Sequence, residues 1–108
     1  MYKALMLDVD GTLSPYSPTA FPEMPRPKVM AAIAAARSKI HIGLATSRPL
    51  IKVEAILCKL ELNGYSILQN GAQIINSSTL ETIWSRPIET TALPNIFEIA
   101  SKYQVQLF

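Results

Sequence analysis

The chain opens with an apolar segment, Ala4–Leu7, that runs directly into two aspartates, Asp8 and Asp10, and a glycine, Gly11. A continuous apolar run bounded by turn residues is typical of a parallel β-strand buried on both faces. Side chains two residues apart in an extended segment point to the same side, so the carboxylates lie close together where this strand ends. Such a pair favours a bound cation or a raised pKa. The alternative is a solvated Asp-Gly turn.

A second strand is predicted to end beside these carboxylates. Five of the eight prolines fall in residues 14–27, which predicts a restricted loop, either a wall over the site or a simple connector. An alanine-rich helix over Pro27–Ser38 and an apolar strand over Ile40–Ala45 follow. A strand–helix–strand unit crosses over right-handed, so both strands are parallel and end at one edge. Ligands bind at that edge in open α/β sheets, and Thr46 is expected there.

The remaining pattern changes near Asn70, from crossover connections to a hairpin. We therefore expect a core over residues 1–69 and the beginning of a second, truncated subdomain over residues 70–108. The predicted elements are a helix over Pro49–Leu60, strands over Tyr65–Gln69, Ala72–Asn76 and Leu80–Ser85, a helical stripe from Leu93 to Tyr103, and the start of a strand over residues 105–108.

Composition limits the partners. Hydrophobic residues make up 49% of the chain and charged residues 17%, below the usual ~25%. The low charged fraction indicates either elements covered on more than one side or surfaces that bind a partner or further chain. The net charge is +2 and the basic residues are scattered, so we expect neither nucleic acid nor a membrane as partner. Cys58 cannot form an internal disulfide and is predicted to be a small buried hydrophobe. The apolar start is too short for a signal or membrane segment, which favours the cytoplasm.

Two groups of residues resemble a known family. The run Asp8–Leu13 is similar to the first motif of the haloacid dehalogenase (HAD) superfamily, Asp-x-Asp-Gly-Thr-Leu. Thr46-Ser47-Arg48-Pro49, followed by Asn70-Gly71-Ala72, resembles the Cof-type branch (subclass IIB), whose members usually read Thr-Gly-Arg-Pro and Asn-Gly-Ala. Ser47 departs from that pattern. The resemblance implies an α/β fold, a Rossmann-like HAD core followed by the start of an α/β cap.

The residues themselves suggest phosphoryl transfer. Asp8 can act as a nucleophile that forms an aspartyl-phosphate, and Asp10 can protonate the leaving group and then activate water. A hard cation, Mg²⁺, would bridge Asp8 and a phosphate oxygen, and the resemblance adds the Asp10 carbonyl as a ligand. Thr46 either binds phosphate or caps a helix. Arg48 either binds phosphate or is solvated, and Asn70 either contacts substrate or forms an Asn-Gly turn.

Three functions remain open at this point. The first is a Mg²⁺-dependent phosphatase for a small phosphorylated metabolite, such as a sugar phosphate. The second is a catalytically silent remnant or split subunit that binds metal, phosphate or a partner chain, and the third is a phosphomutase of the same subclass. The family's third motif, a lysine, and its fourth, an acidic cluster, have no match in these 108 residues. We therefore expect little activity from the chain alone, together with self-association or binding to a complementing chain.

Overall fold

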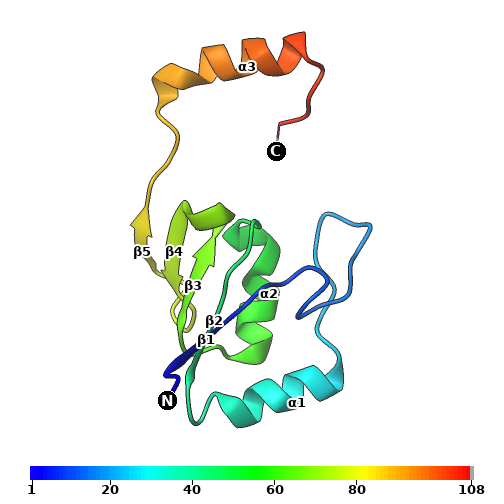
Figure 1. The fold of residues 1–108 in the computed structure, drawn as a ribbon, viewed down its shortest axis with the longest axis vertical. Coiled ribbons are helices and arrows are strands. Elements are labelled where there is room, and N and C mark those ends of the chain that lie inside the picture. The colour runs from blue at the N-terminus through cyan, green and yellow to red at the C-terminus, as the bar shows by residue number, and fades with distance from the viewer. Residues whose placement is uncertain (108) are drawn as a thin grey trace.

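The fold is built on two strand ladders that lie side by side, as Figure 1 shows for residues 1–107, the part of the chain that this computed structural model describes. Strands β1 and β2 are parallel, and strands β3, β4 and β5 form an antiparallel ladder in that order. The predicted α/β fold is confirmed, and for the helices and strands that form, the predicted limits agree within two residues. The elements are β1 (Ala4–Leu7), α1 (Pro27–Ala36), β2 (His41–Leu44), α2 (Leu50–Leu60), β3 (Tyr65–Leu68), β4 (Gln73–Asn76), β5 (Thr82–Ser85) and α3 (Leu93–Lys102).

The first crossover forms as the sequence predicts. Ala4 pairs with His41 and Leu7 with Leu44, so β1 and β2 are parallel and in register. The prediction that β1 is buried on both faces is wrong, because Leu5 and Met6 keep 39% and 41% of their surface exposed. Strand β1 has a neighbour on one side only in the described chain, and this leaves its other edge open.

Strands β2 and β3 approach each other closely and join the two ladders. Their contacts include backbone bonds from Gly64 N–H to the Ile42 carbonyl (2.8 Å) and from Thr46 N–H to the Ile67 carbonyl (3.0 Å). Between them, the Ser66 hydroxyl accepts the Leu44 N–H at 2.9 Å. Gly43 lies in this contact, where a side chain would overlap the carbonyl oxygen of the next strand. A glycine is therefore required in the middle of β2.

We expect Gly43→Ala to destabilise the fold strongly. Its Cβ would overlap the Tyr65 carbonyl oxygen, so β3 would have to move and lower the free energy of unfolding by about 3 kcal/mol. Denaturant unfolding followed by circular dichroism measures the loss. Gly71→Ala is the control, because Gly71 has open space around it but a φ of +96°, a strain of about 1 kcal/mol. Equal losses in the two variants would contradict the close approach.

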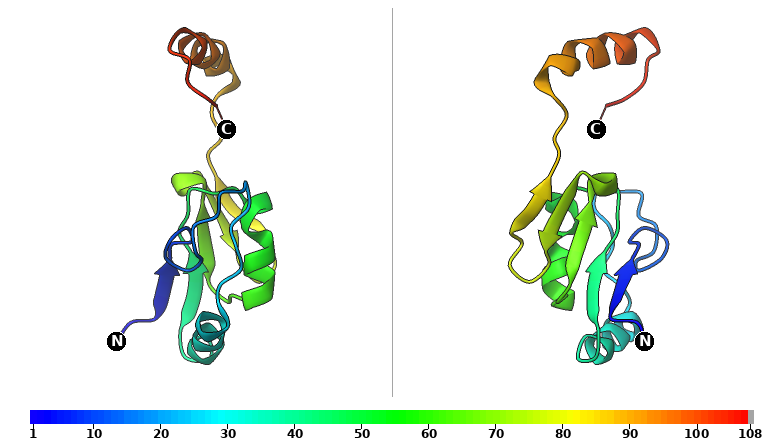
Figure 2. Two further views of the ribbon diagram at one scale, coloured as in Figure 1. Left: turned by 90° about the vertical axis from the view of Figure 1, so that its right-hand side faces the viewer. Right: turned by 60° about the vertical axis from the view of Figure 1, so that its left-hand side comes forward.

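Helices α1 and α2 cover one face of the sheet, as Figure 2 shows. The buried side of helix α2 carries Val53, Ile56, Leu57 and Leu60. Periodicity predicts Leu50 on this side in place of Ile56, and Leu50 is partly buried against the core. The prediction that Cys58 is buried is wrong: it is exposed, since it follows Leu57 by about 100° around the helix. The buried core consists of Val9, Leu13, Ile33, Ile42, Leu44, Val53, Ile56, Leu57, Leu60, Leu62, Leu68 and Ile75.

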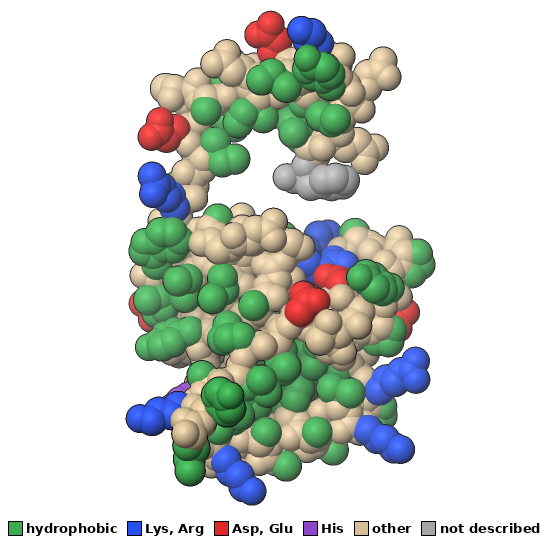
Figure 3. Space-filling model, in the orientation of Figure 1, with side chains coloured by type: hydrophobic (Ala, Val, Ile, Leu, Met, Phe, Trp, Pro, Cys, Tyr) green, Lys and Arg blue, Asp and Glu red, His purple; other side chains and the backbone are tan. Residues whose placement is uncertain are grey.

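Helix α3 stands away from the rest of the molecule at the end of an extended connection (Figure 1). The radius of gyration is 16.0 Å, above the ~13 Å of a compact chain of this size. Hydrophobic side chains line the side of α3 that faces the sheet (Figure 3). The predicted strand over residues 105–108 is wrong for residues 105–107, which find no partner strand, and Phe108 lies outside the described residues. The division of the chain at Asn70 stays a prediction.

No helix in residues 1–107 combines the length and the apolar character needed to cross a membrane. The longest, α2, has 11 residues, whereas a span needs about 20.

Candidate active site

A tight turn at the end of β1 presents the two aspartates. The N–H groups of Thr12 and Ser14 donate to the Val9 carbonyl at 3.2 and 3.0 Å, and the turn passes through Gly11 with a φ of +75°, a conformation that favours glycine. The Val9 side chain is fully buried between the two carboxylate residues. Asp8 and Asp10 therefore both face away from the core, as their spacing predicts.

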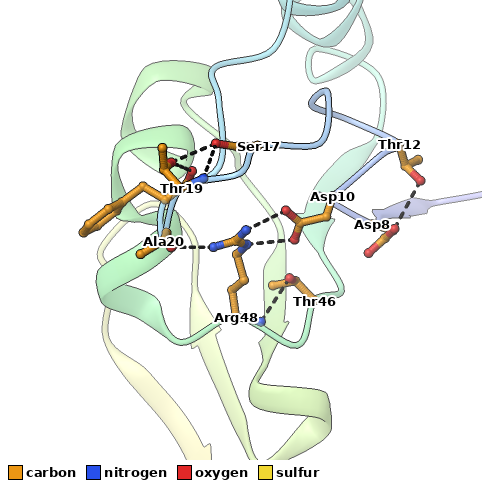
Figure 4. Close-up of polar contacts among 9 residues, drawn as sticks. Asp8, Asp10, Thr12, Ser17, Thr19, Ala20, Thr46 and Arg48 are labelled. Carbon is orange, nitrogen blue, oxygen red and sulfur yellow. Dashed lines mark hydrogen bonds and ion pairs between the residues drawn. The ribbon is translucent and has the colours of Figure 1, made fainter. Parts of the chain in front are cut away.

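Asp8 is held by one neighbour and otherwise accessible. The Thr12 hydroxyl donates to Oδ2 of Asp8 at 3.1 Å, as Figure 4 shows. The other carboxylate oxygen, Oδ1, has no hydrogen-bond partner within residues 1–107. An ionised carboxylate accepts at both oxygens, so Oδ1 is available to a ligand. Sequence reasoning gave Thr12 no role, although the residue belongs to the motif.

Thr46 and Asn70 lie together opposite Asp8. Thr46 is 7% exposed, and its hydroxyl oxygen accepts the Arg48 N–H at 3.1 Å, which leaves the hydroxyl hydrogen free to donate. The Asn70 N–H donates to the Thr46 carbonyl at 3.2 Å, and Asn70 has a left-handed backbone conformation. No side chain caps α2, so Thr46 is not its N-cap. An open hollow of about 450 Å³ is lined by Asp8, Ala45, Thr46, Ser47, Ile67, Asn70 and Gly71.

Asp10 and Arg48 form a bidentate pair outside this lining. Nε and Nη2 of Arg48 donate to Oδ2 and Oδ1 of Asp10, each at 2.8 Å. This hydrogen-bonded guanidinium holds the pKa of Asp10 below its usual value, although partial burial acts the other way. The same contact raises the pKa of Arg48. Arg48 is therefore neither solvated nor in the hollow with Thr46 and Asn70, and its predicted phosphate contact remains a prediction.

The proline-rich loop over residues 14–26 reaches the site through Ala20. The carbonyl oxygen of Ala20 accepts from Nη1 of Arg48 at 2.7 Å (Figure 4). Next to it, the Lys52 ammonium lies 3.9 Å from the centre of the Phe21 ring. Sequence patterns left open whether this loop is a wall or a connector, and no residue type signals a contact made by a backbone carbonyl.

Comparison with known proteins shows to which family the chain belongs. The family of haloacid dehalogenase-like hydrolases matches residues 5–108, nearly the whole chain. The chain belongs to this family. The resemblance inferred from the aspartate motif is thus confirmed, and the matched region begins within β1, the strand that leads to Asp8.

Solved structures of HAD proteins share the fold of this HAD-like chain. A haloacid dehalogenase-like hydrolase from Bacteroides thetaiotaomicron aligns with a TM-score of 0.78 at 23% identity over 96% of this chain and 39% of its own. One from B. subtilis gives 0.76 at 21% identity over 95% of this chain and 34% of its own. A HAD subclass IIB sugar phosphatase gives 0.66 at 22% identity over 94% of this chain and 38% of its own. None of the curated proteins compared with the chain matches it.

This HAD-like chain thus spans 34% to 39% of the length of these three relatives. Within residues 1–107, no cluster of three or more histidine, cysteine, aspartate or glutamate residues is placed to hold a metal ion. At the strand end the Asp8 carboxylate is exposed, and the Asp10 backbone carbonyl accepts no backbone hydrogen bond from the described residues. Carboxylate and carbonyl oxygens suit Mg²⁺, which keeps several waters and needs few protein ligands.

Proposed function

We propose that this chain is the N-terminal part of a Mg²⁺-dependent phosphatase that acts on a small phosphorylated metabolite, such as a sugar phosphate. The observation that carries the proposal is the hollow in which Asp8 faces Thr46 and Asn70 at the carboxyl ends of β1, β2 and β3. A carboxylate with one free oxygen beside a hydroxyl with a free hydrogen suits a tetrahedral phosphoryl group. Membership of the HAD-like family supports the same reaction class.

In the proposed reaction, an Asp8 oxygen attacks phosphorus and forms an acyl phosphate while the bond from phosphorus to the ester oxygen breaks. Asp10 gives its proton to the departing alkoxide. Water then attacks the phosphorus and passes a proton to Asp10, which releases phosphate and restores the Asp8 carboxylate. Thr46 and Asn70 are proposed to donate hydrogen bonds to the phosphoryl oxygens. The pairing with Arg48 lowers the pKa of Asp10, which suits its role as base in the second step and opposes its role as acid in the first, where Asp10 must carry a proton.

Mg²⁺ would be held by Asp8 and the Asp10 carbonyl, with Asp10 itself close by, and would neutralise charge on the phosphoryl oxygens. Thr12 orients the Asp8 carboxylate through Oδ2. A cytoplasmic location belongs to the same proposal.

The test of this function is a phosphatase assay on the protein that carries this sequence together with the remaining part of the enzyme. We expect Mg²⁺ to support hydrolysis of p-nitrophenyl phosphate and EDTA to lower the rate to background, with recovery when Mg²⁺ is added back. Ca²⁺ at the same concentration is the control cation, because it takes more ligands in a looser geometry and should support far less turnover. Undiminished activity in EDTA would contradict a metal-assisted reaction.

A second proposed role is that of a split subunit, which acts only with a complementing chain. It is favoured by the open edge of β1 and by an apolar hollow of about 400 Å³ between β1 and α1. Leu5, Leu7, Val29 and Ile33 are among the residues that line this hollow. Parallel sheets are normally covered on both faces, and here helices cover one. The same site would form whether the rest of the enzyme belongs to the same polypeptide or to a separate, complementing chain.

A further inference from the structure

Arg48 joins two parts of the chain that are distant in sequence. Two of its nitrogens hold both oxygens of Asp10, and a third holds the Ala20 carbonyl in the proline-rich loop. The side chain of Arg48 is 19% exposed and that of Asp10 24%, so water reaches the pair only partly. A planar guanidinium can make these contacts at once because its donors form a fixed fork.

The loop is folded so that it offers this carbonyl. The Thr19 hydroxyl donates to the Phe21 carbonyl at 2.8 Å, and the Thr19 N–H donates to the Ser17 hydroxyl at 3.2 Å. These bonds bracket Ala20 in a compact local turn. The cation–π contact from Lys52 to Phe21 fixes the same stretch against the first part of α2. The loop is thus attached to the site at two neighbouring points.

We propose that Arg48 is a positioning residue that couples the loop over residues 14–26 to the Asp10 carboxylate, so that the two are placed together. The catalytic meaning of this coupling rests on the proposed function. In Figure 4, Asp10 lies between Asp8 and the loop residues. A substrate with its phosphoryl group on Asp8 and its leaving group at Asp10 therefore extends toward the loop, which contacts the part of the substrate that departs.

The contacts favour positioning over direct phosphate binding. Asp8, Thr46 and Asn70 line one hollow, and Arg48 is not among its lining residues. Three of the five N–H donors of Arg48 are used by Asp10 and Ala20. To hold phosphate with its full fork, Arg48 would have to release Asp10.

Limited proteolysis of the 108-residue chain tests the coupling directly. Glu23 is exposed in the loop, and cleavage after it by Glu-C protease, followed by mass spectrometry, reports how often the loop opens. We expect Asp10→Asn and Arg48→Lys each to raise the rate of this cleavage about fivefold, since each removes the two-point contact. Asp8→Asn is the matched control, because Asp8 contacts Thr12 and not Arg48, and should change the rate less than twofold.

Cleavage after Glu54, in the middle of α2, corrects each rate for global unfolding. If Asp10→Asn leaves the corrected loop cleavage unchanged, or if Asp8→Asn raises it equally, the coupling is wrong. The same holds if Arg48→Lys behaves like the unmodified chain, because a lysine has the charge but not the fork.

A kinetic comparison separates positioning from phosphate binding in the complete enzyme. An alkyl phosphate needs a proton on its leaving group, whereas p-nitrophenolate departs without one. With Arg48→Lys we expect kcat to fall about tenfold on the alkyl phosphate and far less on p-nitrophenyl phosphate, with KM changed less than about twofold on both. An equal rise of KM on both substrates would instead identify Arg48 as a phosphate ligand. Failure of the proposed function appears separately, as no turnover in the unmodified enzyme.

Discussion

Asp8→Asn is expected to lower phosphatase turnover of the complete enzyme by at least about 10³-fold, because the substitution removes the nucleophile and a metal ligand together. The amide is nearly isosteric with the carboxylate, and its oxygen still accepts the hydroxyl of Thr12, which now donates to Asp8 at 3.1 Å. Asp8 is also exposed, so the fold should change little. Steady-state kinetics with p-nitrophenyl phosphate and thermal unfolding of the same samples measure both effects.

Glu54→Gln provides the matched control for this loss. It makes the same carboxylate-to-amide change at an exposed position of α2, away from the hollow, and should leave kcat and KM unchanged. Asp8→Asn also blocks formation of an acyl phosphate, so the mass increase expected for a phosphorylated intermediate on rapid quenching should disappear. An Asp8→Asn enzyme with normal turnover would place the nucleophile elsewhere and contradict the covalent route.

The sequence predicted the parts of the site that depend on chain topology. An apolar run that ends in Asp8, a crossover helix and a second strand that ends in Thr46 leave little choice about which ends of the strands meet. Asn70 lies two residues after the end of β3, and its left-handed backbone conformation is one that asparagine tolerates. These three residues therefore share one hollow for reasons that can be read from local patterns.

The contacts of Arg48 could not be predicted in the same way. Its partner Asp10 is 38 residues distant and the Ala20 carbonyl 28 residues distant in sequence, and a backbone carbonyl has no sequence signal. The prediction that β1 is buried was also wrong. An apolar run indicates that a strand favours burial, but it does not show whether a neighbouring strand or helix is present to cover it. Gly43 carried no predicted role, because the close approach of β2 and β3 is a tertiary contact.

The isolated 108-residue chain is expected to associate and to show little or no phosphatase activity. Phe97 and Ile99 in α3 are 57% and 58% exposed, and Tyr103 just after it is 66% exposed. The exposed side chains of α3 and the open edge of β1 are thus two separate apolar surfaces. A monomer in water rarely keeps such surfaces exposed. Few charges oppose association, because charged residues make up 17% of the chain.

Activity should be low because the described residues give a cation little support. Within residues 1–107, no group of three or more acidic, histidine or cysteine side chains is placed to hold a metal ion, and Mg²⁺ dehydrates reluctantly unless a near-octahedral set of ligands is offered. Within residues 1–107, no lysine lines the hollow that contains Asp8 and Thr46. The charge of a phosphate beside the Asp8 carboxylate is thus left without the positioned cations on which phosphoryl transfer depends.

Size-exclusion chromatography with light scattering measures the association over a range of chain concentrations. A Mg²⁺-dependent phosphatase assay on the same samples measures the activity. Met6→Lys at the edge of β1 and Phe97→Glu on α3 should each shift the chain toward monomer, because a charge on an open edge or an apolar patch opposes pairing. Ala34→Lys, on the exposed side of α1, adds the same charge as Met6→Lys away from both surfaces and should leave the distribution unchanged. A chain that is monomeric at all concentrations and turns over substrate at an ordinary enzymatic rate would show that these surfaces need no partner and that the site is already complete.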